Sequence, residues 1–400
     1  MIEHTGASVK GVGEKQDACY NEGTNTTQGE NAMPVINLDH AATTRPEPEV
    51  IAAVTACMRD CWANPSAAYQ GASQARRMLL QTRRTLAKLL RCDPAEIVFT
   101  SGGTESNNTA LRLAEGRHAV VSAVEHSSVL EAAQLWAKDV TCVQPDSRGL
   151  IHPEAVEAAL RPDTALVSVQ WANNETGVRQ SVEVIGRMLR ARRIPFHVDA
   201  VQAVGHVPVD VACCDMLSLS AHKFYGPRGA GALYVRQGTP VKPLLAGGGQ
   251  EGGRRSGTEN VPAIAGMGVA ADMALKDMLP RAERERQLLR ELLGLLQADI
   301  PGVTLLGEDA ARLPGIMAVR FPGLPSEIAI AALDSLGIQV SGGAACAASS
   351  GEASHVYRAM GLTEAEARQV LRISIGRHTT GEDIRTAARA MAAVWRKHHG

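Results

Sequence analysis

The sequence lacks the features that mark several special classes of protein. Its formal net charge is -1, so bulk electrostatics favour neither nucleic acid nor an anionic membrane surface. No apolar run approaches the roughly 20 residues that a membrane-spanning helix needs. We therefore expect no nucleic-acid partner and no membrane partner. A hydrophobic content of 45% and a charged content of 21% are typical of a globular enzyme.

The cysteines show neither a CxxC pair nor the regular spacing of a disulfide framework, although the chain has 8 of them. In a long chain without a signal peptide, this usage indicates reduced thiols and a cytoplasmic location. Cys57 and Cys61 could share one helix face, but no pair of histidines accompanies them. We therefore expect no metal site.

Residues 1–33 differ in composition from the rest of the chain. They are rich in Gly, Asn, Thr, Glu and Gln, and they have almost no apolar periodicity. They also lack the apolar core of a signal peptide. We expect a disordered extension, or a start codon assigned upstream of a true start at Met33.

From about residue 95 the chain alternates between strand and helix patterns. Continuous apolar runs predict strands at 97–100, 119–124, 166–170, 196–198, 216–220 and 231–235. Helical patterns at 129–138 and 182–192 lie between some of them. This alternation predicts an α/β domain with a mainly parallel sheet, which binds its ligands at the carboxyl ends of the strands.

A second pattern follows the Gly-rich segment 240–262. Two helices are predicted at 263–274 and 282–297, with Pro280 between them. An α+β pattern comes next, at 314–321, 328–336 and 364–375. We expect a large domain at 49–278 and a smaller α+β domain formed by 34–48 and 279–400.

Lys223 stands where a cofactor lysine would stand. One apolar strand ends in Asp199, and the next runs into Ser220-Ala221-His222-Lys223 and a Gly/Pro loop. Pyridoxal 5'-phosphate (PLP) needs a lysine to hold its aldehyde as a Schiff base and an acid to keep its pyridine nitrogen protonated. For Lys223 alone, a surface charge at a turn is the simpler interpretation. The motifs below favour the cofactor site.

Other polar residues follow the predicted strands in the same way. Thr100 leads into a bend with Gly103 and Thr104, where glycine lets the backbone approach an anion and a helix begins. His126 and Asn174 follow two further strands. We expect these residues to meet at one edge of the sheet, with a phosphate in the Gly-rich bend.

Cys346 lies in a loop made almost entirely of Gly, Ala and Ser. Such a loop has little bulk with which to bury a thiol, and it can move. A mobile cysteine can reach a cofactor site and leave with what it has picked up. A tight turn with an incidental cysteine is the alternative.

Taken together, these motifs resemble the NifS/IscS-type cysteine desulfurases, PLP enzymes of the class V aminotransferase family. The resemblance runs from Leu38 to Arg377. Its motifs include 38–44, 64–66, 100–108, 125–126, 173–177, 199–202, 220–223, 255–258 and the Cys346 loop. It implies PLP fold type I, like that of aspartate aminotransferase, with a mainly parallel seven-stranded sheet and a smaller α+β domain.

The resemblance also implies a role for each site residue. Lys223 would hold the cofactor, Asp199 would pair with the pyridine nitrogen, and Gln202 would bond the phenolic oxygen. His126 would stack on the ring and shuttle protons. The phosphate would be held by Gly103, Thr104, Ser220, His222 and, from the other subunit of a homodimer, Thr258. Asn174 and Arg372 would bind the substrate, and Cys346 would accept its sulfur.

The implied reaction takes sulfur from L-cysteine, gives L-alanine and leaves a persulfide on Cys346. The sulfur would go to iron–sulfur clusters or a thio-cofactor through a scaffold or acceptor protein. The family loop usually reads Ser-Ser-Gly-Ser-Ala-Cys-Thr-Ser, whereas residues 341–348 here lack two hydroxyls beside Cys346. Alternatives are a selenocysteine lyase or cysteine sulfinate desulfinase, a transaminase, and a non-catalytic protein of the same fold.

Overall fold

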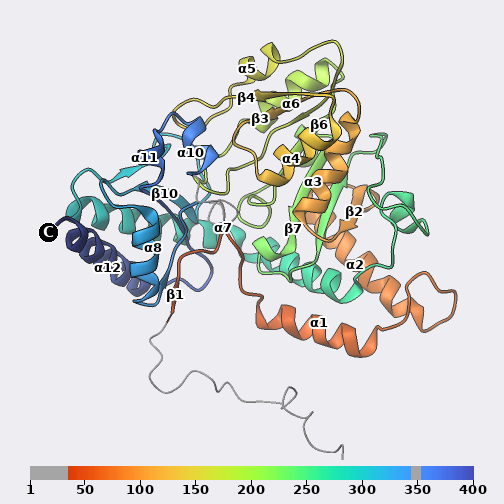
Figure 1. The fold of residues 1–400 in the computed structure, drawn as a ribbon. Helices are drawn as coiled ribbons and strands as arrows, with labels where there is room; N and C mark the ends of the chain where they lie inside the picture. The colour runs from red at the N-terminus through yellow and green to blue at the C-terminus, as the bar shows by residue number, and fades with distance from the viewer. Residues whose placement is uncertain (1–34, 344–352) are drawn as a thin grey trace, which may run out of the picture. The chain divides into compact units, whose positions relative to one another are not determined.

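A seven-stranded sheet organises the larger part of the chain (Figure 1). The structure is a computed structural model that describes residues 35–343 and 353–400. The predicted extension 1–33 and the Cys346 loop lie outside these ranges. Within them, none of the helices is both long enough and apolar enough to span a bilayer.

The strand order is β2-β8-β7-β6-β5-β3-β4. The bounds are β2 (Ile97–Thr100), β3 (His118–Ser122), β4 (Asp139–Val143), β5 (Thr164–Ser168), β6 (Phe196–Asp199), β7 (Met216–Ser220) and β8 (Gly231–Val235). The neighbours from β4 to β7 pair in parallel, and β8 runs antiparallel to both β7 and β2. The prediction of a mainly parallel seven-stranded sheet is confirmed.

Burial explains which strands the sequence revealed. All residues of β2, β3, β5, β6, β7 and β8 are buried, as continuous apolar runs require. The edge strand β4 is mostly accessible and has no such run, so the sequence did not predict it. Crossover helices α3 (Gly103–Leu111), α4 (Ser127–Trp136), α5 (Pro153–Ala158) and α6 (Val182–Ala191) connect the strands.

Three further helices pack together beside the sheet. They are α1 (Pro48–Asp60), α2 (Ala72–Leu90) and α7 (Val261–Asp299). A Cβ atom on Gly268 would lie 2.5 Å from Thr82 Oγ1, so the glycine lets α7 approach α2 closely. The Thr82 hydroxyl donates a hydrogen bond to the Ile264 carbonyl across this contact, at 3.2 Å.

The predicted break at Pro280 is wrong, because α7 is one helix of 39 residues that contains this proline. A proline inside a helix costs about 3 kcal/mol. The two halves of α7 are buried in different clusters, with Ala270 and Ala274 in one and Leu289 and Leu292 in the other. Packing on both sides of the proline outweighs the local cost. Figure 1 shows α7 running from α1 and α2 towards α8 and α12.

The C-terminal part has its own sheet and its own core. Its elements are β9 (Thr304–Leu305), β10 (Ile316–Arg320), α8 (Ser326–Asp334), β11 (Ile338–Gln339), α10 (His355–Ala359), α11 (Glu364–Ala367), β12 (Val370–Ser374) and α12 (Gly381–His399). Strands β12, β10 and β9 form an antiparallel sheet, and β1 (Ile36–Asn37) pairs with β11. One hydrophobic cluster joins Leu38 to this part. The domain boundaries given above stay a prediction.

The topology brings distant residues to one edge of the large sheet. Strands β3, β5, β6 and β7 are mutually parallel, and β2 has the same direction because β8 is antiparallel to both of its neighbours. The carboxyl ends of all five strands therefore lie on one side. In an open α/β sheet, this is the side where ligands bind.

Candidate active site

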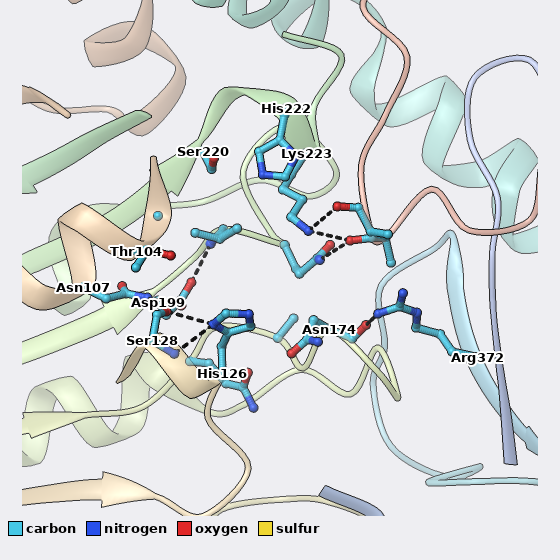
Figure 2. A pocket seen from close by; sticks show the side chains of 17 residues that line it. Thr104, Asn107, His126, Ser128, Asn174, Asp199, Ser220, His222, Lys223 and Arg372 are labelled. Carbon is cyan, nitrogen blue, oxygen red and sulfur yellow. Dashed lines mark hydrogen bonds between the residues drawn. The ribbon is translucent and has the colours of Figure 1, made fainter. Parts of the chain in front are cut away.

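A cavity of about 250 Å³ lies at this edge of the sheet (Figure 2). Ten of the predicted site residues line it: Gly103, Thr104, His126, Asn174, Asp199, Gln202, Ser220, His222, Lys223 and Arg372. Thr258 is not among the lining residues. It lies instead by a separate small cavity with Thr100 and Ser101. Cys346 lies outside the described residues.

Lys223 presents its amine to the cavity from the turn that follows β7 (Figure 2). Its Nζ donates hydrogen bonds to the carbonyl oxygens of Ala41, at 2.7 Å, and Ala42, at 2.8 Å. Burial, and next the charge of Arg372, lower the pKa of Lys223 to about 8, although Asp39 and Asp199 oppose the change. A substantial fraction of this amine is therefore uncharged and nucleophilic near neutral pH.

Asp199 ends β6 with its carboxylate held on both oxygens. Oδ2 accepts a hydrogen bond from Asn107 Nδ2 at 2.8 Å, and Oδ1 accepts one from the Val201 backbone N–H at 2.9 Å. These bonds fix the orientation of the carboxylate at the cavity wall. Beside it, Gln202 Nε2 donates to the Ala41 carbonyl at 2.9 Å.

The start of α3 forms a cradle for an anion. The helix begins at Gly103, and no side chain in the described part of the chain caps its first turn, so its first N–H groups are available to a ligand. A Cβ atom on Gly103 would lie 2.7 Å from Val201 Cγ2, so only glycine fits there. The hydroxyls of Thr104 and Ser220 line the same end of the cavity.

His222 completes this end of the cavity. Its Nδ1 shares a hydrogen bond of 3.1 Å with the Thr43 hydroxyl. Burial, and next the charges of Lys223 and Arg228, lower the pKa of His222 to about 4. The ring is therefore neutral at physiological pH, when it can still donate one hydrogen bond.

Arg372 supplies a cation at the opposite end of the cavity (Figure 2). It comes from β12 and is 2% exposed. Nη1 donates to the Asn174 carbonyl at 3.1 Å and Nη2 to Asp39 Oδ1 at 2.6 Å, whereas Nε has no partner among the described residues. A buried planar cation with a free donor fits a carboxylate ligand.

Some lining residues were given no role by the sequence analysis, although Ala41, Ala42 and Asn107 lie within its motifs 38–44 and 100–108. Ala41 and Ala42 act through backbone carbonyls, for which a sequence carries no signal. Asn107 and Ser128 also line the cavity, three residues after Thr104 and two residues after His126. Asn and Ser are common in the first turns of helices, so only the contacts of these two side chains in the structure identify them as site residues.

Glu175 lies beside both described ends of the segment that carries Cys346. The Ser354 hydroxyl donates to Glu175 Oε2 at 2.6 Å, and a Cβ atom on Gly343 would lie 2.8 Å from the same oxygen. Burial raises the pKa of Glu175, although Ser354, His355 and Arg372 oppose it. A single buried carboxyl group therefore contacts residues on either side of positions 344–352.

Comparison with known proteins agrees with this geometry. The family model for class-V aminotransferases matches residues 36–386. The chain is 40% identical over 372 residues to a cysteine desulfurase of Nostoc sp., which covers 90% of this chain and 93% of that one. A solved NifS-like protein superposes with a TM-score of 0.84 at 32% identity, over 91% of this chain and 100% of the other.

A third match is a structure of SspA in complex with cysteine, with a TM-score of 0.76 and 37% identity, over 86% of this chain and 99% of that one. The chain belongs to the class-V aminotransferase family of PLP-dependent enzymes. Within that family it groups with the cysteine desulfurases, and the resemblance to the NifS/IscS type is confirmed.

The cavity fits PLP by its own chemistry. The uncapped start of α3, with Thr104 and Ser220, offers N–H and hydroxyl donors for a phosphate. Asp199 offers a carboxylate for a pyridinium nitrogen, and Lys223 offers an amine of lowered pKa for an aldehyde. All of these groups line one cavity.

Proposed function

We propose that this protein is a cysteine desulfurase that converts L-cysteine to L-alanine and transfers the sulfur to Cys346 as a persulfide. One observation carries the proposal. The amine of Lys223, the carboxylate of Asp199, the uncapped start of α3 and the buried Arg372 line a single cavity. When bound, PLP supplies an electron sink for carbanion chemistry at the substrate α-carbon.

Each residue of the cavity would have a separate role in the reaction of the substrate. Arg372 binds the α-carboxylate, and the Asn174 carbonyl holds one arm of its guanidinium. The uncharged amine of Lys223 removes the α-proton. The Cys346 thiolate bonds to the substrate sulfur while the bond between that sulfur and Cβ breaks. Protons return to the carbon skeleton, so the products are alanine and a Cys346 persulfide.

The proposal includes a homodimer in which Thr258 contacts the phosphate held by the other subunit. Two observations support it. Thr258 does not line the Lys223 cavity of its own chain. Helix α1 and the segment after it carry large exposed apolar side chains, with Met58 65% and Trp62 82% exposed. Covering such side chains with a partner subunit removes apolar surface from water, which lowers the free energy of the complex.

The sulfur acceptor and the location complete the proposal. A persulfide is a carrier of sulfur, so we propose an acceptor or scaffold protein that takes it towards iron–sulfur clusters or a thio-cofactor. We also propose a cytoplasmic location. Free thiols support it, because none of the cysteines at 57, 61, 92, 142, 213 and 214 is paired.

The test is to measure alanine and sulfide released from L-cysteine in the presence of a thiol reductant. Wild type should give equal amounts of both, and Cys346→Ala should lose both while PLP stays bound. Cys142→Ala is the matched control, because Cys142 is an exposed thiol on β4 and should not affect the reaction. Lys223→Ala should abolish the chemistry.

Two results would contradict the proposal. Full turnover of L-cysteine by Cys346→Ala would exclude the persulfide role of this residue. A wild-type protein that binds PLP but acts only on selenocysteine or cysteine sulfinate would instead be a lyase or desulfinase. The missing hydroxyls beside Cys346 make this comparison of substrates necessary.

A further inference from the structure

A chain of hydrogen bonds connects Asp199 to the imidazole of His126 (Figure 2). Asn107 Nδ2 donates to Asp199 Oδ2 at 2.8 Å and to Ser128 Oγ at 2.9 Å. Ser128 Oγ lies 2.8 Å from His126 Nδ1. Asn107 is 1% exposed, so water does not compete for these bonds. The roles implied by family resemblance do not include Asn107 or Ser128.

The charge of Asp199 fixes the direction of the first bonds. An ionised carboxylate can only accept hydrogen bonds, so the NH₂ group of Asn107 must face it. The second hydrogen of that NH₂ group then points at Ser128 Oγ. Turning the amide over would place its oxygen against the carboxylate oxygen of Asp199, which has no hydrogen to donate. Ser128 Oγ is therefore an acceptor from Asn107.

The proton of the Ser128 hydroxyl is then free to point at His126. The backbone N–H of Ser128 donates to the same nitrogen, Nδ1, at 3.1 Å. A proton on Nδ1 would lie against this N–H. Two donors thus meet at Nδ1, which leaves it as the acceptor nitrogen of the ring. In a neutral imidazole the proton must then be on Nε2.

The position of His126 in the fold also favours a neutral ring. His126 is the N-cap of α4, where the positive end of the helix dipole disfavours a charged ring. Burial lowers the pKa of His126, and Lys223 and His355 lower it further, whereas Asp199 raises it. A neutral histidine at a helix N-terminus can act as a hydrogen-bond donor in catalysis.

We propose that Asn107 and Ser128 are positioning residues that hold neutral His126 as its Nε2–H tautomer, so that His126 meets the substrate as a hydrogen-bond donor rather than as a base. Among the residues that the structure describes, Nε2 has no hydrogen-bond partner, and the ring lines the cavity. The inference rests on the proposed function, and it reassigns the proton shuttle expected at His126.

The proposal has a consequence for the substrate protons. A ring with its proton on Nε2 has no free lone pair on the side of the cavity. Protons that leave the substrate thiol or ammonium group must go to another base. The Lys223 amine, whose pKa is lowered to about 8, is such a base in the same cavity.

The test is nitrogen NMR of the holoenzyme labelled with ¹⁵N-histidine. His126→Gln assigns the His126 signals by their loss. In wild type, Nδ1 should give the shift of an unprotonated ring nitrogen and Nε2 that of a protonated one. Ser128→Ala removes one donor to Nδ1, so the pKa of His126 should rise by about half a unit to one unit. Ser128→Thr keeps the hydroxyl and should restore the wild-type value.

His222 is the internal control, because it lies in the same cavity but bonds Thr43 rather than Ser128. Its titration should not change in Ser128→Ala. A proton on Nδ1 of His126 in wild type would overturn the proposal. An unchanged His126 titration in Ser128→Ala would overturn the role of Ser128. These spectra do not depend on turnover. The protonation of His126 can therefore be determined even if the desulfurase assay fails, and the two failures can be told apart.

Discussion

The amine of Lys223 should titrate far below an ordinary lysine when the cofactor has been removed. The side chain lies in a cavity whose walls replace most of its water, and the cation of Arg372 adds repulsion. Both effects favour the uncharged amine. Asp39 and Asp199 oppose them but are the smaller causes.

The size of the effect follows from the shift in pKa. The pKa of Lys223 falls from the ordinary 10.5 to about 8. At pH 7.5, about one ordinary lysine in a thousand is uncharged, whereas about a quarter of Lys223 should be. The uncharged fraction therefore rises roughly two hundredfold. This rise lets Lys223 react with an aldehyde and remove an α-proton near neutral pH.

The assay is competitive acetylation of the cofactor-free protein over a range of pH, with each lysine peptide quantified by mass spectrometry. Lys223 should become reactive with a midpoint near its pKa of about 8. Lys88 on α2 is exposed and serves as the reference lysine. Arg372→Gln should move the midpoint of Lys223 upwards, because the second cause of its low pKa is gone.

A midpoint for Lys223 that coincides with that of Lys88 would refute the reasoning. It would mean that the carbonyls of Ala41 and Ala42 stabilise the ammonium form enough to cancel the effect of burial. A midpoint near 8 that does not move in Arg372→Gln would leave burial as the cause and remove Arg372 from the explanation.

Two further predictions concern stability. Gly186→Ala should lower the free energy of unfolding by about 3 kcal/mol, because its Cβ would lie 1.9 Å from the Cys213 carbonyl oxygen. Gly294→Ala is the control, because Gly294 lies in open space on α7, and this substitution should raise the free energy of unfolding by about 0.5–1 kcal/mol. Urea unfolding measures both, and equal effects would contradict the packing argument. Burial lowers the pKa of His197 and of His206 from 6.5 to about 3, so the stability they contribute is complete above pH 6.5 and is lost as the pH falls towards 3. Between pH 7 and 5.5 these two residues together should lower the free energy of unfolding by about 2.5 kcal/mol. His40 and His222, whose pKa values are lowered to about 4, add to the fall, so His197→Gln should reduce the measured fall by about 1.2 kcal/mol.

Much of the site could be predicted because parallel sheets place their ligand residues in a regular way. The buried strands β6 and β7 are continuous apolar runs, and Asp199 and Lys223 come at or just after their ends. An acid and a lysine at neighbouring strand ends suggest a PLP site without any knowledge of the fold. The edge strand β4 could not be predicted in the same way, because only part of it is buried.

The sequence by itself determined the class of enzyme, the mainly parallel sheet and the identity of the charged site residues. The tertiary structure decided how those residues are held. The carbonyls that bind Lys223 come from Ala41 and Ala42, whose side chains say nothing about hydrogen bonding. The direction of the bonds from Asp199 to His126 depends on which groups face each other across the cavity. Packing likewise keeps α7 helical across Pro280, because the burial of both halves outweighs the tendency of proline to end a helix.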